Sequence, residues 1–431
     1  MSRLTAADFE IRRLGETRIP SPLRWGRFLD DEHQVRLKIA LRSRNGDQPD
    51  LLLQPGGPRA RLFFDPQQTT AAIVTCGGIC PGLNNVIRSI VQELQYNYEV
   101  PRILGIRYGY LGLTGRGSPP MPLNSERVAD IQHLGGTILG SSRGPQEPAE
   151  MLEFLRRNNV QILFCLGGDG TQRGAAAIDT IAREQNYPLS VVGIPKTIDN
   201  DVPFVDLSFG HVTALEQARA VLQSAHVEAR GFPNGIAIVK LMGRDAGFIA
   251  AGAAITSGDA NFVLIPEVPF PLTGSSGFLT LLEQRMQDRG HALIVAAEGA
   301  GQHLFSDQVT ATDGSGNRRY HDIGLFLKER ISEYFAEKKF PVTLKYLDPS
   351  YQIRSVPANT WDCWLCDQMA RNAVHAGMAG YTGLLIGSIH NEFVHVPIQA
   401  AVQQKRQLDL QGDLWSAVLA ATGQPEWMPT V

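Results

Sequence analysis

The stretch ILFCLGGDGTQRG, residues 162–174, decides the fold of this chain. Its apolar first half is typical of a buried β-strand, and the polar residues that follow are compatible with a helix. Glycines join the two parts and leave one carboxylate, Asp169, on an otherwise bare turn. A strand that passes through a glycine turn into a helix is typical of a βαβ unit, and an acid on that turn suggests a role beyond packing.

The same order of apolar strand, glycine turn and helix recurs along the chain. Buried strands that alternate with helices predict an α/β fold of two Rossmann-like three-layer lobes with mostly parallel sheets. Ligands bind such sheets beyond the carboxyl ends of the strands, so we expect the active site in the cleft between the lobes. Besides the opening stretch, the segments with this pattern are 71–78 with 82–94, 102–113, 189–201, 235–254, 260–270 and 291–302.

The 431 residues are predicted to form four segments. Residues 1–69, rich in Arg, Pro and Asp, form an N-terminal extension. Residues 70–209 form the first lobe, completed by part of 355–405, and residues 210–354 form the second lobe. Residues 406–431 form a C-terminal helix and tail.

Composition excludes several classes of protein. A formal net charge of −3 gives no electrostatic reason to expect a nucleic-acid or membrane partner. No run of about 18 apolar residues predicts a membrane span. The five cysteines and the lack of an apolar leader in residues 1–16 favour a cytoplasmic protein. The pair Cys363 and Cys366 is expected to lie in the core on one helix turn, with a redox or metal role as the alternative.

Two glycine turns are candidates for phosphate binding. In TCGGICPGLNN, 75–85, glycines expose backbone N–H groups at a helix start, where an anion is favoured. In LGGDGT, 166–171, Asp169 either caps the helix or holds Mg²⁺ through waters while its neighbours line a polyphosphate. Lipid kinases and NAD kinases also use a GGDGT-like turn, so this motif indicates a nucleotide phosphate without indicating the acceptor.

The segment IPKTIDNDVP, 194–203, combines acids with a base. On extended chain Asp199 and Asp201 would point to the same side, because side chains alternate with a period of two. One could accept a proton from a substrate hydroxyl, and the other could hold a metal or orient the site. Lys196 suits a phosphoryl group in transfer. A solvated loop is the alternative.

Further cations and one acid follow at later strand ends. Taken singly, each could be a surface ion pair or a side chain that covers apolar surface. Together they would supply cations for a sugar phosphate and an acceptor for sugar hydroxyls. These residues are Lys240, Arg244, Glu298, Lys345, Tyr351 and Arg354.

An ordered set of motifs between about residues 70 and 355 resembles the phosphofructokinase family. The N-terminal RRLGETRIPSPL, the wording TCGGICPGLNNVIRSIV and AEGAGQ are similar to the plant and trypanosomatid ATP-dependent branch, which is related to the pyrophosphate-dependent enzymes. The motifs are GGICPGLNN, GSSRG, GGDGT, PKTIDND, KLMGR, PEVPF and AEGAG.

The resemblance implies transfer of the γ-phosphoryl group of ATP to the C1 hydroxyl of fructose 6-phosphate, with Mg²⁺, as the committed step of glycolysis. Asp199 matches the general base, with Lys196, Asp201 and Arg244 also catalytic, and Asp169 matches the metal ligand. The nucleotide-binding lobe would be the first, and the sugar-phosphate-binding lobe the second. Nucleotide-binding positions are Gly78, Tyr110, Arg143, Gly144, Gly168, Asp169, Gly170, Thr171 and Lys240. Substrate positions are Thr197, Ile198, Asp199, Met242, Gly243, Arg244, Glu298, Lys345, Tyr351, Gln352, Ile353 and Arg354.

Two positions concern the phosphoryl donor: the bacterial ATP-dependent enzymes have glycine where this chain has Lys196, and the pyrophosphate users differ from it at Gly170. Lys196 is the choice typical of pyrophosphate users, whereas those enzymes carry aspartate where this chain has Gly170. An aspartate there would crowd and repel the α-phosphate of ATP. ATP is therefore the predicted donor, with pyrophosphate as the alternative. Gly235 and Tyr351 also replace an arginine and a histidine of the bacterial enzymes, which weakens the analogy to their allosteric and subunit-bridging details.

Other classes of function fit less well. A catalytically silent nucleotide-sensing subunit would be expected to lose the general base or the metal ligand, and this chain keeps acids at both positions. A dinucleotide-binding oxidoreductase would be expected to carry a G-x-G-x-x-G fingerprint, which this chain lacks. Sedoheptulose 7-phosphate stays open as an acceptor. The resemblance also implies a homo-oligomer, a homotetramer or a homodimer, in which Lys345 stands where bacterial enzymes have an arginine from a neighbouring subunit.

Overall fold

The computed structural model describes residues 4–24, 26–38, 51–305 and 319–427, which form two compact units. Unit 1 comprises Met1–Thr197, Val202–Gly210 and Ser355–Lys405. Unit 2 comprises Ile198–Asp201, His211–Arg354 and Arg406–Val431. The chain therefore leaves unit 1 for only four residues, 198–201, before it returns, and these residues carry Asp199 and Asp201.

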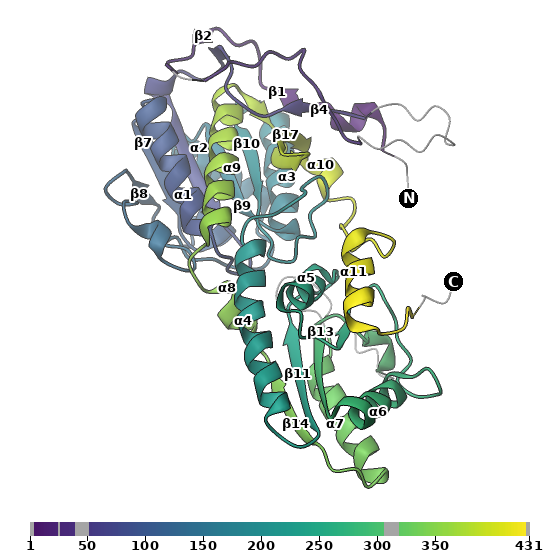
Figure 1. Cartoon of the computed structure of the whole chain (residues 1–431). Coiled ribbons are helices and arrows are strands. Elements are labelled where there is room, and N and C mark those ends of the chain that lie inside the picture. Colours follow the sequence, from purple (N-terminus) through teal and green to yellow (C-terminus); the bar gives the residue numbers. More distant parts are fainter. Residues whose placement is uncertain (1–3, 25, 39–50, 306–318, 428–431) are drawn as a thin grey trace. The chain divides into compact units, whose positions relative to one another are not determined.

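A nine-stranded sheet forms the centre of unit 1 (Figure 1). Its five central strands are parallel, and the outer strands on both sides are antiparallel. Most central strands are buried along their whole length, which explains their continuous apolar sequences. In sheet order the strands are β3 (Val35–Arg36), β4 (Leu52–Pro55), β17 (Glu392–Pro397), β16 (Leu384–Ile389), β10 (Ser190–Pro195), β9 (Ile162–Gly167), β6 (Thr70–Thr75), β7 (Arg102–Ile106) and β8 (Met121–Leu123).

Helices cover both faces of this sheet, so unit 1 has three layers (Figure 1). On one face α9 packs on β9, β10 and β16 and also on α1, and on the other face α3 packs on β9 and β10 with α2 beside it. The helices are α1 (Leu83–Gln92, continued by a π-turn over Glu93–Asn97), α2 (Pro148–Arg157), α3 (Asp169–Glu184), α9 (Thr360–Met378) and α10 (Ile398–Ala401).

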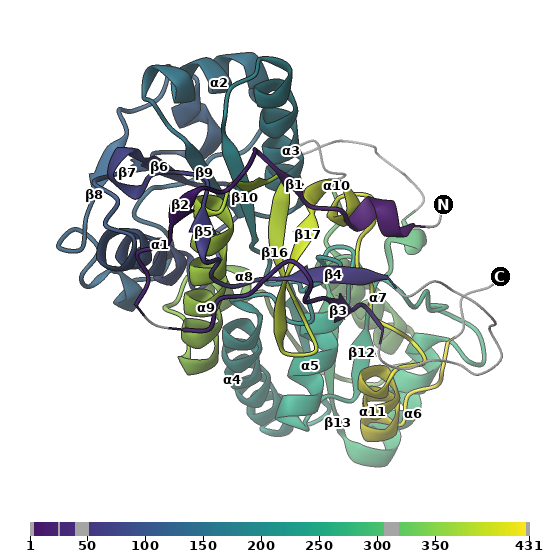
Figure 2. The same cartoon turned by 90° about the horizontal axis from the view of Figure 1, so that it is seen from above.

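The N-terminal extension is built into unit 1. Its strand β4 pairs with β17 at the edge of the large sheet (Figure 2), and β1 (Arg12–Arg13) pairs with β15 (Tyr381–Thr382). The Tyr381 hydroxyl donates to Asp31 at 2.5 Å and accepts from Gln54 at 2.7 Å. These long-range contacts make the extension a structural part of this unit. Its other strands, β2 (Ile19–Pro20) and β5 (Arg61–Leu62), pair with each other.

Unit 2 has a four-stranded, fully parallel sheet between two layers of helices (Figure 1). The strand order is β12 (Phe262–Leu264), β13 (His291–Ala297), β11 (Gly235–Leu241) and β14 (Thr343–Leu347). Helices α4 (His211–Arg230) and α5 (Phe248–Ser257) form one layer, and α6 (Phe278–Arg289) and α7 (Ile323–Glu337) form the other. The short helix α8 (Ser350–Arg354) follows β14, and the predicted C-terminal helix is α11 (Asp413–Thr422).

Among the described residues, no helix combines the length and the apolar character that a membrane span requires. The five cysteines are present as thiols. Cys363 and Cys366 lie on one turn of α9, where Cys366 is buried and Cys363 is partly exposed, as expected for a helix that packs on the sheet.

Buried neutral histidines make the fold sensitive to acid. Burial lowers the pKa of His375 and His395 in unit 1 to about 3, and that of His211 in unit 2 to about 4. Nδ1 of His375 forms a hydrogen bond with the Tyr98 hydroxyl at 2.9 Å. The ring of His395 packs against the Tyr381 ring. Each histidine takes up a proton near its ordinary pKa only in the unfolded chain, so the free energy of unfolding must fall as the pH falls below about 6.5.

We predict that His395→Gln weakens this dependence. When the pH falls from about 7 to about 5, one such histidine lowers the free energy of unfolding of the wild type by roughly 2 kcal/mol. The decrease over the same pH range should be smaller by that amount in the variant. Urea unfolding at both pH values measures the difference, with the exposed His133→Gln as control. Equal pH dependence in wild type and His395→Gln would contradict a buried neutral His395.

Candidate active site

The register of the parallel strands brings three turns of unit 1 together. Thr75 of β6 lies opposite Leu166 of β9, and Gly167 lies opposite Pro195 of β10. The backbone N–H of Cys76 donates to the Leu166 carbonyl at 3.0 Å, and that of Lys196 donates to Gly167 at 3.1 Å. The turns that follow β6, β9 and β10 therefore lie side by side at the carboxyl ends of the central strands. Ligands bind at this end of such sheets, where the chain connections reverse direction.

Two glycines of the turn after β9 differ in the space around them. A Cβ on Gly167 would lie 2.1 Å from Oγ1 of Thr171, so packing alone requires glycine there. A Cβ on Gly170 would meet nothing within 4 Å. Because Gly170 lies in the first turn of α3, where glycine weakens the helix, packing does not account for it, and room for a ligand does.

Asp169 does not cap α3. The N-cap is Gly168, which has no side chain to bond with, and Asp169 is the first residue of the helix. Its carboxylate lies 2.7 Å from Arg173, one turn along. The helix dipole favours a negative charge at this N-terminal position. The side chain of Asp169 remains about one-third exposed.

Lys196 and Tyr110 support the glycine turns from within. Lys196 is 6% exposed, and its ammonium donates to the Gly78 carbonyl at 2.5 Å, which connects the turns after β10 and β6. Tyr110 is buried, and its hydroxyl donates to the Thr171 carbonyl at 2.6 Å. Its position suggests that it holds the start of α3 rather than reaching a ligand. Arg143 is exposed on the loop before α2.

Unit 2 repeats this arrangement with different side chains. The N–H of Glu298, after β13, donates to Leu241 of β11 at 2.9 Å, and Gly299 donates to Gly243 at 3.1 Å. The turns after β11 and β13 are therefore adjacent. Arg244 stacks on the ring of Tyr320, with its guanidinium carbon 5.2 Å from the ring centre.

Asp199 and Asp201 lie in a turn, so the expectation of extended chain between them is wrong. Asn200 between them has a left-handed backbone, with φ of 57°, as Asn tolerates. Burial, then the nearby charges of Asp201 and Glu298, raises the pKa of Asp199 well above its usual range. A carboxyl with a raised pKa is a stronger base when ionised, which suits proton abstraction.

The segment after β14 presents both exposed and buried side chains. Tyr351 is 74% exposed, and the Arg354 guanidinium carbon lies 5.0 Å from the centre of its ring. Gln352 is exposed. Ile353 is fully buried, so its side chain packs in the core, and only its backbone could meet a substrate. Nε of Arg354 is buried and has no hydrogen-bond partner among the described residues.

Burial also raises the pKa of Glu298, while the charges of Arg244 and Lys240 lower it in part. Arg244 lies in the same turn as Met242 and Gly243, and Lys240 lies near the end of the strand that leads into this turn. The acid is therefore held between burial, which favours its neutral form, and cations, which favour its ionised form.

The two remaining lysine candidates belong to unit 2. Lys240 belongs to β11, and its ammonium contacts Asp322 at 2.5 Å and Asp348 at 2.9 Å. Lys345 lies in the middle of the edge strand β14, not at its carboxyl end. It is 45% exposed, 3.7 Å from Glu228, and rests against the ring of Phe232.

The predicted residues thus divide between the units. Unit 1 holds every nucleotide-site candidate except Lys240, and unit 2 holds every substrate-site candidate except Thr197. In unit 1 these are Gly78, Tyr110, Arg143, Gly144, Gly168, Asp169, Gly170, Thr171, Lys196 and Thr197. In unit 2 they are Ile198, Asp199, Asp201, Lys240, Met242, Gly243, Arg244, Glu298, Lys345, Tyr351, Gln352, Ile353 and Arg354.

Three supporting residues had no signal in the sequence. His211 at the start of α4 donates from Nδ1 to the Ile198 carbonyl at 2.6 Å, because a carbonyl oxygen can only accept. Ser208 donates to the Thr197 carbonyl at 2.6 Å. Tyr320 donates to Asp245 at 2.7 Å. None belongs to a motif, and only the fold brings each to its partner.

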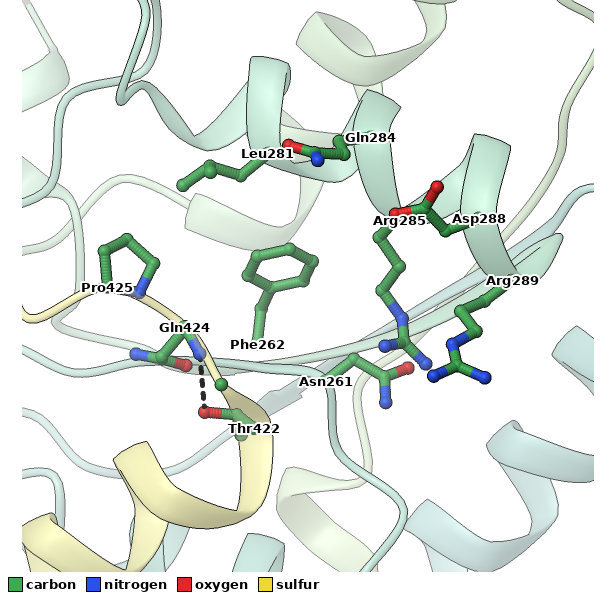
Figure 3. A pocket seen from close by; sticks show the side chains of 11 residues that line it. Asn261, Phe262, Leu281, Gln284, Arg285, Asp288, Arg289, Thr422, Gln424 and Pro425 are labelled. Carbon is green, nitrogen blue, oxygen red and sulfur yellow. Dashed lines mark hydrogen bonds between the residues drawn. The ribbon is translucent and has the colours of Figure 1, made fainter.

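A separate pocket of about 210 Å³ lies in unit 2, and no predicted site residue lines it (Figure 3). Side chains of α6 form one wall and the segment after α11 another, where the Gln424 N–H donates to Thr422 at 3.3 Å. Its lining residues are Asn261, Phe262, Leu281, Gln284, Arg285, Asp288, Arg289, Thr422, Gly423, Gln424 and Pro425.

Few side chains could coordinate a metal ion at this site. Within the described ranges no group of three or more His, Cys, Asp or Glu side chains could hold a metal ion. A single partly exposed carboxylate such as Asp169 suits Mg²⁺ that arrives with phosphate and water ligands, because Mg²⁺ keeps most of its own shell.

We predict opposite effects of one substitution at two glycines of this turn. Gly167→Ala should destabilise the protein by about 1–3 kcal/mol because its Cβ overlaps Thr171. Gly170→Ala should stabilise the ligand-free protein by about 0.5–1 kcal/mol because alanine favours the helix. Urea unfolding of both variants is the measurement, and an equal loss at Gly170 would show that its space is not open.

Comparisons with known proteins identify the family of this chain. Residues 70–377 match the family model "Phosphofructokinase". The ATP-dependent 6-phosphofructokinase of Borreliella burgdorferi is 46% identical over 97% of both chains. The enzyme of that name from Trypanosoma brucei brucei is 42% identical over 98% of this chain and 88% of its own. A solved pyrophosphate-dependent phosphofructokinase from Marinobacter aquaeolei shares the fold with a TM-score of 0.67 at 20% identity, covering 84% of this chain and 93% of that one. The chain belongs to the phosphofructokinase family.

Proposed function

We propose that this enzyme transfers the γ-phosphoryl group of ATP to the C1 hydroxyl of fructose 6-phosphate, which gives fructose 1,6-bisphosphate and ADP. Relatives named ATP-dependent 6-phosphofructokinase align over nearly the whole chain at 42–46% identity. This is the first committed step of glycolysis, as the resemblance implies.

The open space at Gly170 carries the proposal for ATP. A donor with three phosphates needs room beside the start of α3 for its α-phosphate, and nothing lies within 4 Å of a Cβ at this position. The helix N-terminus and the backbone N–H groups of the glycine turns favour the phosphate charge. Lys196 holds the turns around this space through Gly78 and supplies a positive charge beside them.

Asp199 is the proposed general base. Its raised pKa and partial burial suit a carboxylate that takes the C1 hydroxyl proton as the oxygen attacks phosphorus. Asp199 follows Lys196 by three residues, and three residue steps span at most about 11 Å. The chain path therefore keeps the base close to the phosphate-binding turns, although the two residues belong to different units.

Arg244, Glu298 and Arg354 are the proposed contacts to fructose 6-phosphate. Two guanidinium groups suit a phosphate, and the Glu298 carboxylate suits sugar hydroxyls. Nε of Arg354 has no protein partner within the described residues, so a bound phosphate would satisfy a buried donor.

Asp169 is the residue that we propose holds Mg²⁺. The ion would neutralise charge on the donor phosphates. Arg173 beside Asp169 is about 61% exposed and can turn toward solvent when the carboxylate takes another partner.

We also propose a cytoplasmic homo-oligomer. Five cysteine thiols are compatible with a reducing compartment. Lys345 is half-exposed on the edge strand β14, which suits a residue that acts in a neighbouring subunit.

Asp199→Asn should lower kcat by about 10²–10⁴-fold because the amide cannot accept the proton. KM for ATP should change little, since the donor site is in unit 1. Steady-state kinetics measure both constants. Asp206→Asn is the control, because an amide can still accept from the His390 N–H as Asp206 does. Near wild-type turnover of Asp199→Asn would remove Asp199 from the reaction.

Gly170→Asp should lower kcat/KM for ATP more than for pyrophosphate, because the added carboxylate occupies and repels the α-phosphate position. Gly170→Asn matches its size without the charge and should have a smaller effect. The ratio of kcat/KM for the two donors is the measurement. An equal loss with both donors would show that Gly170 does not distinguish them.

A further inference from the structure

Lys240 is the one nucleotide-site candidate that lies in unit 2, and its contacts assign it another role. It is the second-last residue of β11, and only 12% of its side chain is exposed. Its ammonium lies 2.5 Å from Asp322 Oδ2 and 2.9 Å from Asp348 Oδ2. One cation between two carboxylates is fully neutralised, so it has little charge left to offer a nucleotide phosphate.

Both carboxylates hold the start of a helix. Asp322 caps α7, where its Oδ1 accepts from the Leu325 N–H at 3.0 Å. Asp348 Oδ1 accepts from the N–H of Ser350, the first residue of α8, at 3.2 Å. Lys240 therefore joins the N-terminal ends of two helices to the end of the central strand of the unit 2 sheet.

The second of these helices carries proposed substrate contacts. Arg354 ends α8, and Tyr351 lies beneath its guanidinium group. The buried Ile353 and the Asp348–Lys240 contact anchor this five-residue helix. A helix this short has little stability of its own, so its position depends on such anchors.

Lys240 also acts on Glu298 through charge. Its ammonium is one of three cations, with Arg244 and Arg354, that favour the ionised form of this partly buried acid. Asp348 opposes that effect, since its negative charge raises the pKa of Glu298. Loss of Lys240 would therefore leave the effect of Asp348 opposed only by Arg244 and Arg354, so the pKa of Glu298 would rise further.

We propose that Lys240 is a positioning residue for the sugar phosphate: by tying Asp322 and Asp348 to β11, it holds α8 and Arg354 in place. The inference rests on the proposed function for the identity of the sugar phosphate. It predicts a defect confined to that substrate, whereas a nucleotide contact would affect ATP.

Two substitutions and one control test the inference on the full-length enzyme. Lys240→Met keeps the length of the side chain and removes the charge, and Lys240→Arg keeps the charge. Lys338→Met is the control, because Lys338 forms a lysine–carboxylate contact in the same unit, 3.2 Å from Glu283, on the exposed side of α6 and α7. Kinetic constants are measured separately for fructose 6-phosphate and ATP.

Lys240→Met should raise KM for fructose 6-phosphate about 10-fold and change KM for ATP less than about two-fold. The pH below which KM for the sugar phosphate rises should move upward in this variant, and Lys240→Arg should restore most of both properties. Lys338→Met should match the wild type. An equal or larger rise in KM for ATP, or no rise in either KM, would overturn the inference.

A second measurement does not depend on activity. Amide hydrogen exchange in α8 of the ligand-free protein should be faster in Lys240→Met than in wild type, with exchange in β11 unchanged. If Lys240→Met does not fold, Asp348→Asn takes its place with the same expected pattern. Unchanged exchange in α8 would overturn the inference. Lack of turnover by the wild type would instead overturn the proposed function and leave this exchange result valid.

Discussion

The parallel register of buried strands is the constraint on which the arrangement of the candidate residues in each unit depends. Because Thr75 lies opposite Leu166 and Pro195 lies opposite Gly167, the turns after β6, β9 and β10 must all begin at the same end of the sheet. The same holds in unit 2, where the Glu298 N–H reaches Leu241 across adjacent strand ends. Chemistry then follows from which residues occupy those turns: glycines and one acid in unit 1, cations and acids in unit 2.

The chain path adds a second constraint. Residues 198–201 belong to unit 2 although the residues on both sides belong to unit 1. The proposed base is therefore attached within three residues of the lysine that supports the phosphate-binding turns. His211 holds one carbonyl of this excursion, and Arg406 donates from its N–H to the Asp201 carbonyl at 2.9 Å, so the turn that presents Asp199 is fixed from unit 2.

Features encoded locally could be predicted from the sequence. Apolar runs gave the buried central strands, glycine turns marked their carboxyl ends, and Asp169 falls at a helix start as its motif indicates. The resemblance to phosphofructokinases is confirmed over most of the chain. The assumption of an extended chain between Asp199 and Asp201 is wrong, and three features of the structure depend on backbone geometry or on residues far apart in the sequence. Asn200 turns the chain between two acids expected on extended backbone, Ile353 faces the core, and the extension joins the large sheet through β4.

Lys240 shows the limit most clearly. Its place in the KLMGR motif indicates a functional cation, and nothing local in the sequence indicates that Asp322 and Asp348, more than 80 residues later, neutralise it. Sequence spacing can assign a charge to a strand end. It cannot show which opposite charges the fold brings to the same point, and that balance decides between ligand binding and positioning.

The most direct test of the account is the initial rate of the wild-type enzyme with fructose 6-phosphate and Mg²⁺, with ATP and pyrophosphate supplied separately. We expect turnover with ATP, because the space at Gly170 accommodates an α-phosphate, and little or none with pyrophosphate. Turnover with pyrophosphate alone would contradict it and would mean that Lys196, not Gly170, determines the donor.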